Sequence, residues 1–346
     1  EDFEQNPYWI QNRIQSKEAR TRLILSLSAN LKVTGWLTLQ ARGNMDYSAD
    51  KLRQKFYAST ATALCGMNGR YIEMDYQETL MYGDVMAMAK KKLNDFTLNI
   101  AIGGSINDKV VNSTRIDSKN ASLKFANVFN LANIVMSSSA SIDQKIDAHY
   151  QLQSVFATAQ AGYKEGAFLD LTARNDWSST LAYTKYEKKG FFYPSIGVSF
   201  LPDKWVKMPE WVSFSKLRGA YSIVGNGVPP FITYPVSYVT AGGGMLASDA
   251  APFAEMKPEM THSVELGMEW KFLQHRLGLN LTYYRTNTYE QFFKLPALAG
   301  DKYAYRYVNA GDIQNQGWEI TLDATPVLTS DFTWKTSMNF SANKNK

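Results

Sequence analysis

Segments in which apolar and polar residues alternate recur along the whole chain and predict β-strands. In one such segment Leu169 and Leu171 fall on one face and Asp170 on the other, because successive side chains of a strand point to opposite sides of a sheet. About twelve strands are expected on this basis, at about 21–29, 33–42, 70–80, 95–104, 149–161, 166–176, 192–201, 214–224, 262–272, 276–287, 315–325 and from about 332.

The connections between these strands alternate between short turns and long segments. Short turns are expected at 30–32, 162–166 and 273–275. Long polar or glycine-rich segments occupy about 43–69, 105–147, 225–259 and 288–313, and the segment 80–95 could contain a helical turn. Outer-membrane barrels have this order, with short periplasmic turns, long extracellular loops, and strands that are apolar outside and polar inside. The pattern therefore predicts an all-β fold, a transmembrane antiparallel β-barrel, although alternating strands also build soluble sandwiches.

Charged side chains on the polar faces favour the barrel over a soluble sheet. Asp170, Arg174, Glu265 and Glu269 would be costly in a soluble core, whereas in a wide barrel they face water or a polar plug. Tryptophan and tyrosine residues near the predicted strand ends suit the membrane headgroup level, where their polar atoms stay hydrated. No apolar run approaches the roughly 18 to 20 residues of a membrane-spanning helix.

Composition and charge exclude further classes of protein. Hydrophobic residues make up 45% of the chain and aromatic residues 13%, which excludes a disordered polymer. The net charge of +5 is modest and the basic residues are scattered among 32 acidic ones, so no nucleic-acid partner is expected. Cys65 is the single cysteine, so the chain makes no internal disulfide and no multi-cysteine metal site.

No arrangement of residues points to catalysis, a metal or a cofactor. His149, His262 and His275 are dispersed without metal-ligand spacing. Glu265 and Glu269 share a strand face but would lie about 13 Å apart at the usual rise of a strand, beyond the separation of a glycosidase pair. We therefore expect neither an enzyme nor a cofactor-binding protein.

Candidate ligand contacts fall at strand ends and in the predicted outer loops. Arg174, Asp176 and Trp177 end a strand beside an outer loop, and the crossing to the next strand is expected at Trp177. The three residues suit either substrate contact or a structural network at that strand end. Aromatic residues of the outer loops suit stacking on sugars or on peptide side chains. Those selected as substrate-binding candidates are Tyr289, Phe292, Tyr303 and Tyr305.

Several segments resemble the SusC/RagA family of TonB-dependent outer-membrane transporters of Bacteroidetes. The matching runs are NPYW (6–9), LDLTARNDWSSTL (169–181), FFYPSIGVSF (191–200), SKLRGAYSIVGN (215–226), MKPEMTHSVELGMEWKF (256–272), RLGLNLTYYRTNTYEQF (276–292) and VNAGDIQNQGWEI (308–320). They recur in order across nearly the whole chain, which makes the resemblance far more specific than one short motif.

The resemblance implies a barrel of 22 strands, of which this chain would supply about half. Residues 1–346 would form a barrel-domain segment of about twelve strands, with the plug domain, the TonB-contacting segment and the final strands lying outside it. A half-barrel has open edges and would not be stable alone in lipid, so we expect the chain to be a part of a longer protein.

The resemblance also implies a function and partners. The expected function is TonB-dependent import of a nutrient, an oligosaccharide or a peptide, across the outer membrane. The expected partners are a SusD-like surface lipoprotein, the TonB complex acting through the plug, outer-membrane lipid and the glycan or peptide ligand. The alternative from another class is a surface adhesin or structural β-protein that binds without transport.

Overall fold

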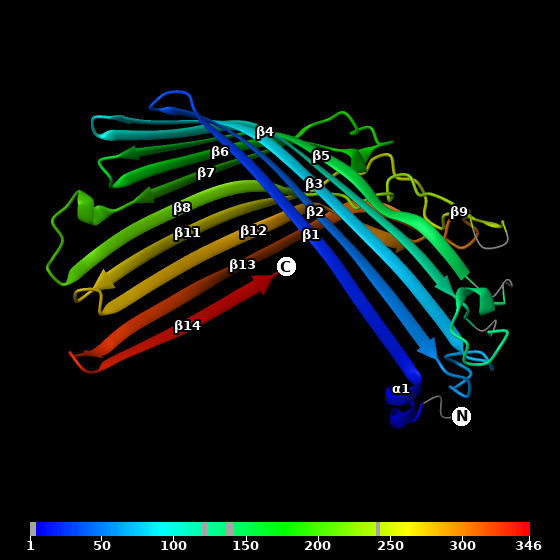
Figure 1. Ribbon diagram of the computed structural model, residues 1–346. Helices are drawn as coiled ribbons and strands as arrows, with labels where there is room; N and C mark the ends of the chain where they lie inside the picture. Colours follow the sequence, from blue (N-terminus) through cyan, green and yellow to red (C-terminus); the bar gives the residue numbers. More distant parts are fainter. Residues whose placement is uncertain (1–4, 120–122, 136–140, 240–242) are drawn as a thin grey trace.

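The computed structural model describes residues 5–119, 123–135, 141–239 and 243–346 (Figure 1). Twelve strands form one continuous antiparallel sheet in chain order, with β11 next to β8. The strands of this sheet are β1 (Ile14–Lys32), β2 (Leu37–Phe56), β3 (Arg70–Leu93), β4 (Phe96–Asp117), β5 (Ser141–Tyr163), β6 (Ala167–Ser178), β7 (Phe191–Phe200), β8 (Val212–Asn226), β11 (Glu259–Phe272), β12 (Leu277–Pro296), β13 (Tyr305–Leu328) and β14 (Thr333–Asn345).

The remaining elements are short. Helix α1 (Pro7–Arg13) precedes β1. In the sequence, the two-stranded ribbon of β9 (Tyr238–Val239) and β10 (Met245–Leu246) comes between β8 and β11. Three single-turn 3-10 helices are Leu131–Asn133, Ser179–Leu181 and Pro202–Lys204. Within the part of the chain that the structure describes, no helix has the length and apolarity needed to cross a membrane.

Figure 1 shows a long curved sheet with β1 and β14 at its two edges. The turns after β1, β3, β5, β11 and β13 are short and lie at one end, on the left of the view, together with the 201–211 connection. The segments 57–69, 118–140, 179–190, 227–258 and 297–304 connect the strands at the opposite end. We call these the short-turn end and the long-loop end.

The pairing register gives the sheet two different faces. Leu171 of β6 pairs with Ala159 of β5 and with Ile196 of β7, so apolar side chains meet on one face. The next residue, Thr172, pairs with polar residues of the same two strands on the other face. The alternation along each strand thus becomes an apolar face and a polar face across the sheet, because strand side chains have a period of two.

Several strands are longer than the alternation predicted. β2 continues to Phe56, β4 continues to Asp117 and β13 begins at Tyr305, within the segments expected to be loops at 43–69, 105–147 and 288–313. Toward the outer ends of these extensions, as at Arg53 and Gln54 of β2, polar residues occupy both faces, so the contrast between faces disappears although the strand pairing continues.

Three local expectations were wrong. Residues 80–95 form no helical turn. They are the end of β3, where Met86 pairs with Gln40 of β2, and the short turn into β4. Residues 30–32 end β1, and the chain turns at 33–36 instead. Trp177 lies within β6, so the crossing to β7 is made by residues 179–190.

The long loops have small apolar cores of their own. Leu181, Val228 and Met256 are buried together, and Phe292 and Tyr307 pack against them. These residues come from two different connections, 179–190 and 227–258, and from the outer ends of β12 and β13. The loops between β6 and β13 therefore pack on one another as a single unit.

Candidate functional site

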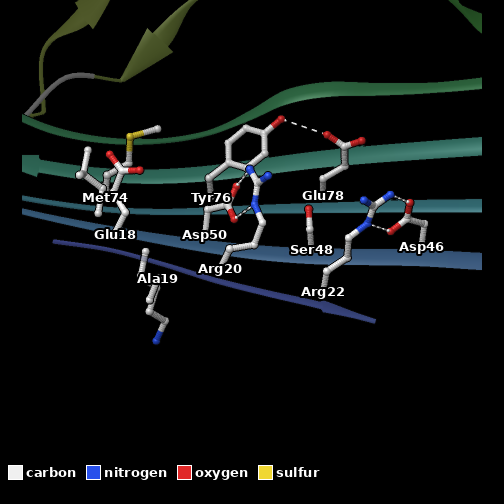
Figure 2. A pocket seen from close by; sticks show the side chains of 12 residues that line it. Glu18, Ala19, Arg20, Arg22, Asp46, Ser48, Asp50, Met74, Tyr76 and Glu78 are labelled. Carbon is white, nitrogen blue, oxygen red and sulfur yellow. Dashed lines mark hydrogen bonds and ion pairs between the residues drawn. The ribbon is translucent and has the colours of Figure 1, made fainter. Parts of the chain in front are cut away.

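Ion pairs gather on the polar face of β1, β2 and β3 toward the long-loop end (Figure 2). The Arg20 guanidinium donates hydrogen bonds to both carboxylate oxygens of Asp50, at 2.5 and 2.6 Å. The Arg22 guanidinium binds Asp46 in the same way, at 2.8 and 2.5 Å. Two parallel hydrogen bonds fix the plane of a guanidinium as well as its position. Each pair therefore presents its hydrogen-bond donors and acceptors in a fixed geometry.

Glu78 of β3 extends this arrangement toward β4. Its carboxylate accepts a hydrogen bond from the Tyr76 hydroxyl at 3.2 Å and is 2.7 Å from the Lys109 ammonium. We call Arg20, Arg22, Asp46, Asp50, Glu78 and Lys109 the charged cluster. Most of them, with Tyr76 and Ser48, line a cavity of about 850 Å³.

The charged cluster carries three cations and three anions, so its formal net charge is zero. The Arg20 side chain is 70% exposed whereas that of Asp50 is 27% exposed, so solvent and solutes reach the guanidinium more easily than its carboxylate. Because each charge is already paired, the cluster offers hydrogen bonds without a strong net field. Such a surface suits polar ligands that are uncharged or carry balanced charges.

Another ion pair lies closer to the short turns. The Arg42 Nε lies 3.0 and 3.2 Å from the two carboxylate oxygens of Asp84, whose side chain is completely buried. A buried carboxylate without this partner would carry a large desolvation penalty. Arg42 therefore serves chiefly to hold Asp84 in place.

The structure brings Arg174 and Asp176 together but not Trp177. The Arg174 Nε donates to Asp176 at 2.7 Å, and its Nη2 donates to the Ser154 hydroxyl at 2.8 Å. All three lie on the polar face. Trp177 follows Asp176 directly in the strand and so points to the apolar face, where it lies beside Val155 and Ile106. Its position is that of an aromatic residue at the edge of an apolar surface.

The four aromatic candidates of the outer loops fall into three places. Tyr289 contacts His262 edge-on, with ring centroids 5.3 Å apart, on the same face of the sheet as Val264. Phe292 packs against the buried loop core. Tyr303 and Tyr305 lie at the tip of the β12–β13 hairpin, where the Lys294 ammonium is 3.9 Å from the Tyr305 ring centroid.

Charged groups tie the outer loops to the strands beneath them. The Lys257 ammonium donates to Glu290 at 2.6 Å, and this hydrogen bond raises the pKa of Lys257. Lys185 forms an ion pair with Glu255, which raises the pKa of Lys185. The backbone N–H of Lys185 also donates to the Ala254 carbonyl. These contacts join the 179–190 and 227–258 loops to each other and to β12.

The charged cluster was missed by the sequence interpretation, because most of it lies in segments expected to be irregular. The turn expected at 30–32 implies a different register for the first hairpin, in which Arg20 would lie opposite Arg42. The observed turn at 33–36 instead pairs Arg20 with Asp50 and places Arg22 near Asp46.

Comparison with known proteins places the chain in a family. Residues 1–346 match the family model described as TonB dependent receptor-like, beta-barrel. TonB-dependent receptor P3 of Formosa agariphila is 29% identical over 206 residues, which cover 57% of this chain and 20% of that protein. TonB-dependent receptor SusC of Bacteroides thetaiotaomicron is 27% identical over 186 residues, covering 49% of this chain and 18% of that protein. The chain thus spans about a fifth of the length of these relatives.

Solved structures show the same fold. The structure of the RagAB peptide transporter aligns with a TM-score of 0.84 at 19% identity, covering 98% of this chain and 38% of that chain. The outer membrane transporter YddB from Escherichia coli aligns with a TM-score of 0.63 at 11% identity, covering 96% and 43%.

These matches identify the two faces and ends of the sheet. The apolar face is the lipid-facing side of an outer-membrane barrel wall, and the polar face is the lumenal side. The short-turn end is periplasmic and the long-loop end extracellular. The expected partial barrel is thereby confirmed, and the chain belongs to the family of TonB-dependent receptor-like β-barrels.

Proposed function

We propose that the protein of which this chain forms a barrel segment imports a nutrient across the outer membrane in a TonB-dependent way. The observation that carries this proposal is the lumenal wall, which presents paired charges to a cavity while its opposite face is apolar. A surface that only anchors or adheres needs no such lining on the inside of its barrel.

The proposal includes three parts outside the chain. A plug domain and a TonB-contacting segment elsewhere in the full protein would close the lumen and transmit the force. A SusD-like surface lipoprotein would bind the extracellular loops and capture the ligand. The family match and the SusC and RagAB relatives support these parts.

The ligand is proposed to be an oligosaccharide or a peptide. Arg174 and Asp176 on the lumenal face, and Tyr303 and Tyr305 at the tip of an outer loop, are proposed to contact it. The other three substrate-binding candidates are less suited to contact the ligand. Trp177 and Tyr289 lie on the lipid-facing side, and Phe292 packs in the loop core.

Deletion of the gene tests the proposal. We expect the deletion strain to lose uptake of, and growth on, one class of oligosaccharide or peptide, and complementation by the full-length gene should restore both. A tagged full-length protein should copurify with a surface lipoprotein encoded by the host. Unchanged growth on every glycan and peptide supplied, together with retained surface binding, would instead support the non-transporting adhesin.

A further inference from the structure

Small hydroxyl side chains form an unbroken row across the lumenal face, one on each of six neighbouring strands. The pairing registers place each directly opposite the next. From β5 to β12 these residues are Thr158, Thr172, Ser195, Ser222, Ser263 and Thr286. We call this set the hydroxyl row.

The neighbours of the row show that it is a separate feature of the wall. On the extracellular side of the row, Phe156, Arg174 and Tyr193 pair with one another across β5, β6 and β7. On the periplasmic side, Gln160 pairs with Asp170. The row itself carries no charge. On β5 and β6 it lies between larger or charged side chains, and on β7 it lies between Tyr193 and Gly197.

The row retains free hydrogen-bonding capacity. Thr172 and Ser195 share a hydrogen bond between their hydroxyls at 2.5 Å, and the Thr286 hydroxyl donates to the Asn315 backbone carbonyl at 3.3 Å. Within the described residues, the hydroxyls of the other three members of the row make no hydrogen bond. Asn315 of β13 continues the row opposite Thr286, and its Oδ1 is buried without a hydrogen-bond partner among the described residues. Each hydroxyl can both donate and accept a hydrogen bond. The row can therefore donate hydrogen bonds to a solute in the lumen beside it, and accept hydrogen bonds from that solute.

The row is inclined along the lumen. Barrel strands tilt by about 35–45° to the barrel axis, so a row at right angles to the strands changes depth from strand to strand. Thr172 is five residues from the short-turn end of β6 at Ala167, whereas Thr286 is nine residues from that of β12 at Leu277. The hydroxyl row thus rises toward the extracellular mouth as it crosses from β6 to β12.

We propose that the hydroxyl row is a path of contact for an uncharged, hydroxyl-bearing solute moving through the lumen. This inference rests on the proposed transport function. Neutral hydroxyls can exchange hydrogen bonds with a sugar, one after another, at small net free-energy change. A charged solute at the row would lose hydration without meeting an opposite charge there. The row therefore favours an oligosaccharide over a charged peptide.

The test compares two triple variants of the full-length protein in its host. One removes hydroxyls from the row by Thr172→Val, Ser222→Ala and Ser263→Ala. The control removes three hydroxyls from other rows of the same face by Thr97→Val, Ser199→Ala and Ser337→Ala. Initial uptake of fluorescent neutral oligosaccharides and of a fluorescent peptide mixture is measured, together with the amount of protein at the cell surface.

We expect oligosaccharide uptake to fall about tenfold in the row variant, because three hydrogen-bonding groups are lost. Surface amount should be unchanged, and the control should match wild type. Wild-type uptake by the row variant would overturn the inference. Loss limited to peptide uptake would overturn the ligand class. Reduced surface protein in the row variant alone would show that the row packs against another part of the chain. A wild-type protein that imports neither probe would refute the proposed function itself.

Discussion

Cys65 is enclosed in the extracellular loop between β2 and β3. Only 1% of its surface is exposed, and its sulfur lies 3.2 Å from the Gly66 carbonyl and 3.9 Å from that of Thr60. Burial raises the pKa of the Cys65 thiol. A buried thiol with a raised pKa forms little thiolate, which is the reactive species.

We therefore expect Cys65 to resist a membrane-impermeant maleimide on intact cells and to react fully after denaturation. Met67 lies two residues away and is 86% exposed, so Met67→Cys in a Cys65→Ser background provides the matched control. Labelling is measured by mass spectrometry. Equal labelling rates of the native thiol and the introduced one would contradict the enclosure of Cys65.

The carboxylate of Asp301 makes the stability of the folded β12–β13 loop depend on pH. The Tyr303 backbone N–H and the Arg306 guanidinium donate to its carboxylate, and they hold the pKa of Asp301 below its usual value. A group whose pKa is lowered by folding stabilises the folded form above its unfolded pKa of about 4. That contribution is lost as the pH falls through the lowered pKa.

Hydrogen exchange followed by mass spectrometry checks this dependence. After correction for intrinsic rates, residues 297–304 of the wild type should become less protected only below about pH 4. Asp301→Asn should be poorly protected throughout and show no such transition. A transition of the same size in the variant would assign it to another group.

At the scale of elements, the loops on the extracellular side act together. Met256 is completely buried between Leu181 and Val228, which belong to different parts of the loop unit. Removing a buried methionine side chain costs about 2–5 kcal/mol when the cavity cannot close. Its loss should loosen every loop that shares the core.

Met256→Ala is therefore expected to increase proteolysis in the 179–190 and 227–258 loops together, while leaving the strands intact. Met245→Ala removes the same atoms from a side chain that is 77% exposed, and it should have little effect. Limited proteolysis of whole cells with peptide mapping gives the readout. Faster cleavage confined to the segment around Met256 would show that the loops are independent.

At the scale of the whole molecule, the apolar and polar faces of the sheet decide which side of the barrel wall contacts lipid. Ile102 is 58% exposed on the lipid-facing side of β4, and the preceding Ala101 pairs with Thr158 on the lumenal side. An arginine on the lipid face costs about 2–4 kcal/mol near the bilayer midplane, whereas lumenal substitutions mainly alter selectivity.

Ile102→Arg should thus lower the amount of folded full-length protein in the outer membrane, and Ala101→Arg should leave it close to wild type. Membrane fractionation with heat-modifiable electrophoretic mobility measures the folded fraction. Equal losses in the two variants would contradict the assignment of the faces.

The fold could be predicted well from local patterns but not in its full extent. Alternation identified the strand cores, such as the one containing Leu169 and Leu171, because one face there meets lipid. The same pattern failed where strands rise beyond the lipid, as in the part of β2 that ends at Phe56. There both faces are wetted, so only the hydrogen-bonded pairing with neighbouring strands shows that the strand continues.

The candidate site depended more on tertiary structure. The sequence by itself determined which residues share a face, as with Arg174 and Asp176, since the period of a strand is two. The register between distant strands decided that Arg20 meets Asp50 and that the hydroxyl row is continuous. The structure also places Trp177 within β6, so the same period of two puts it on the face opposite Arg174. Local residue order fixes the faces of each strand, whereas pairing between strands, set by turns and packing, fixes which side chains meet.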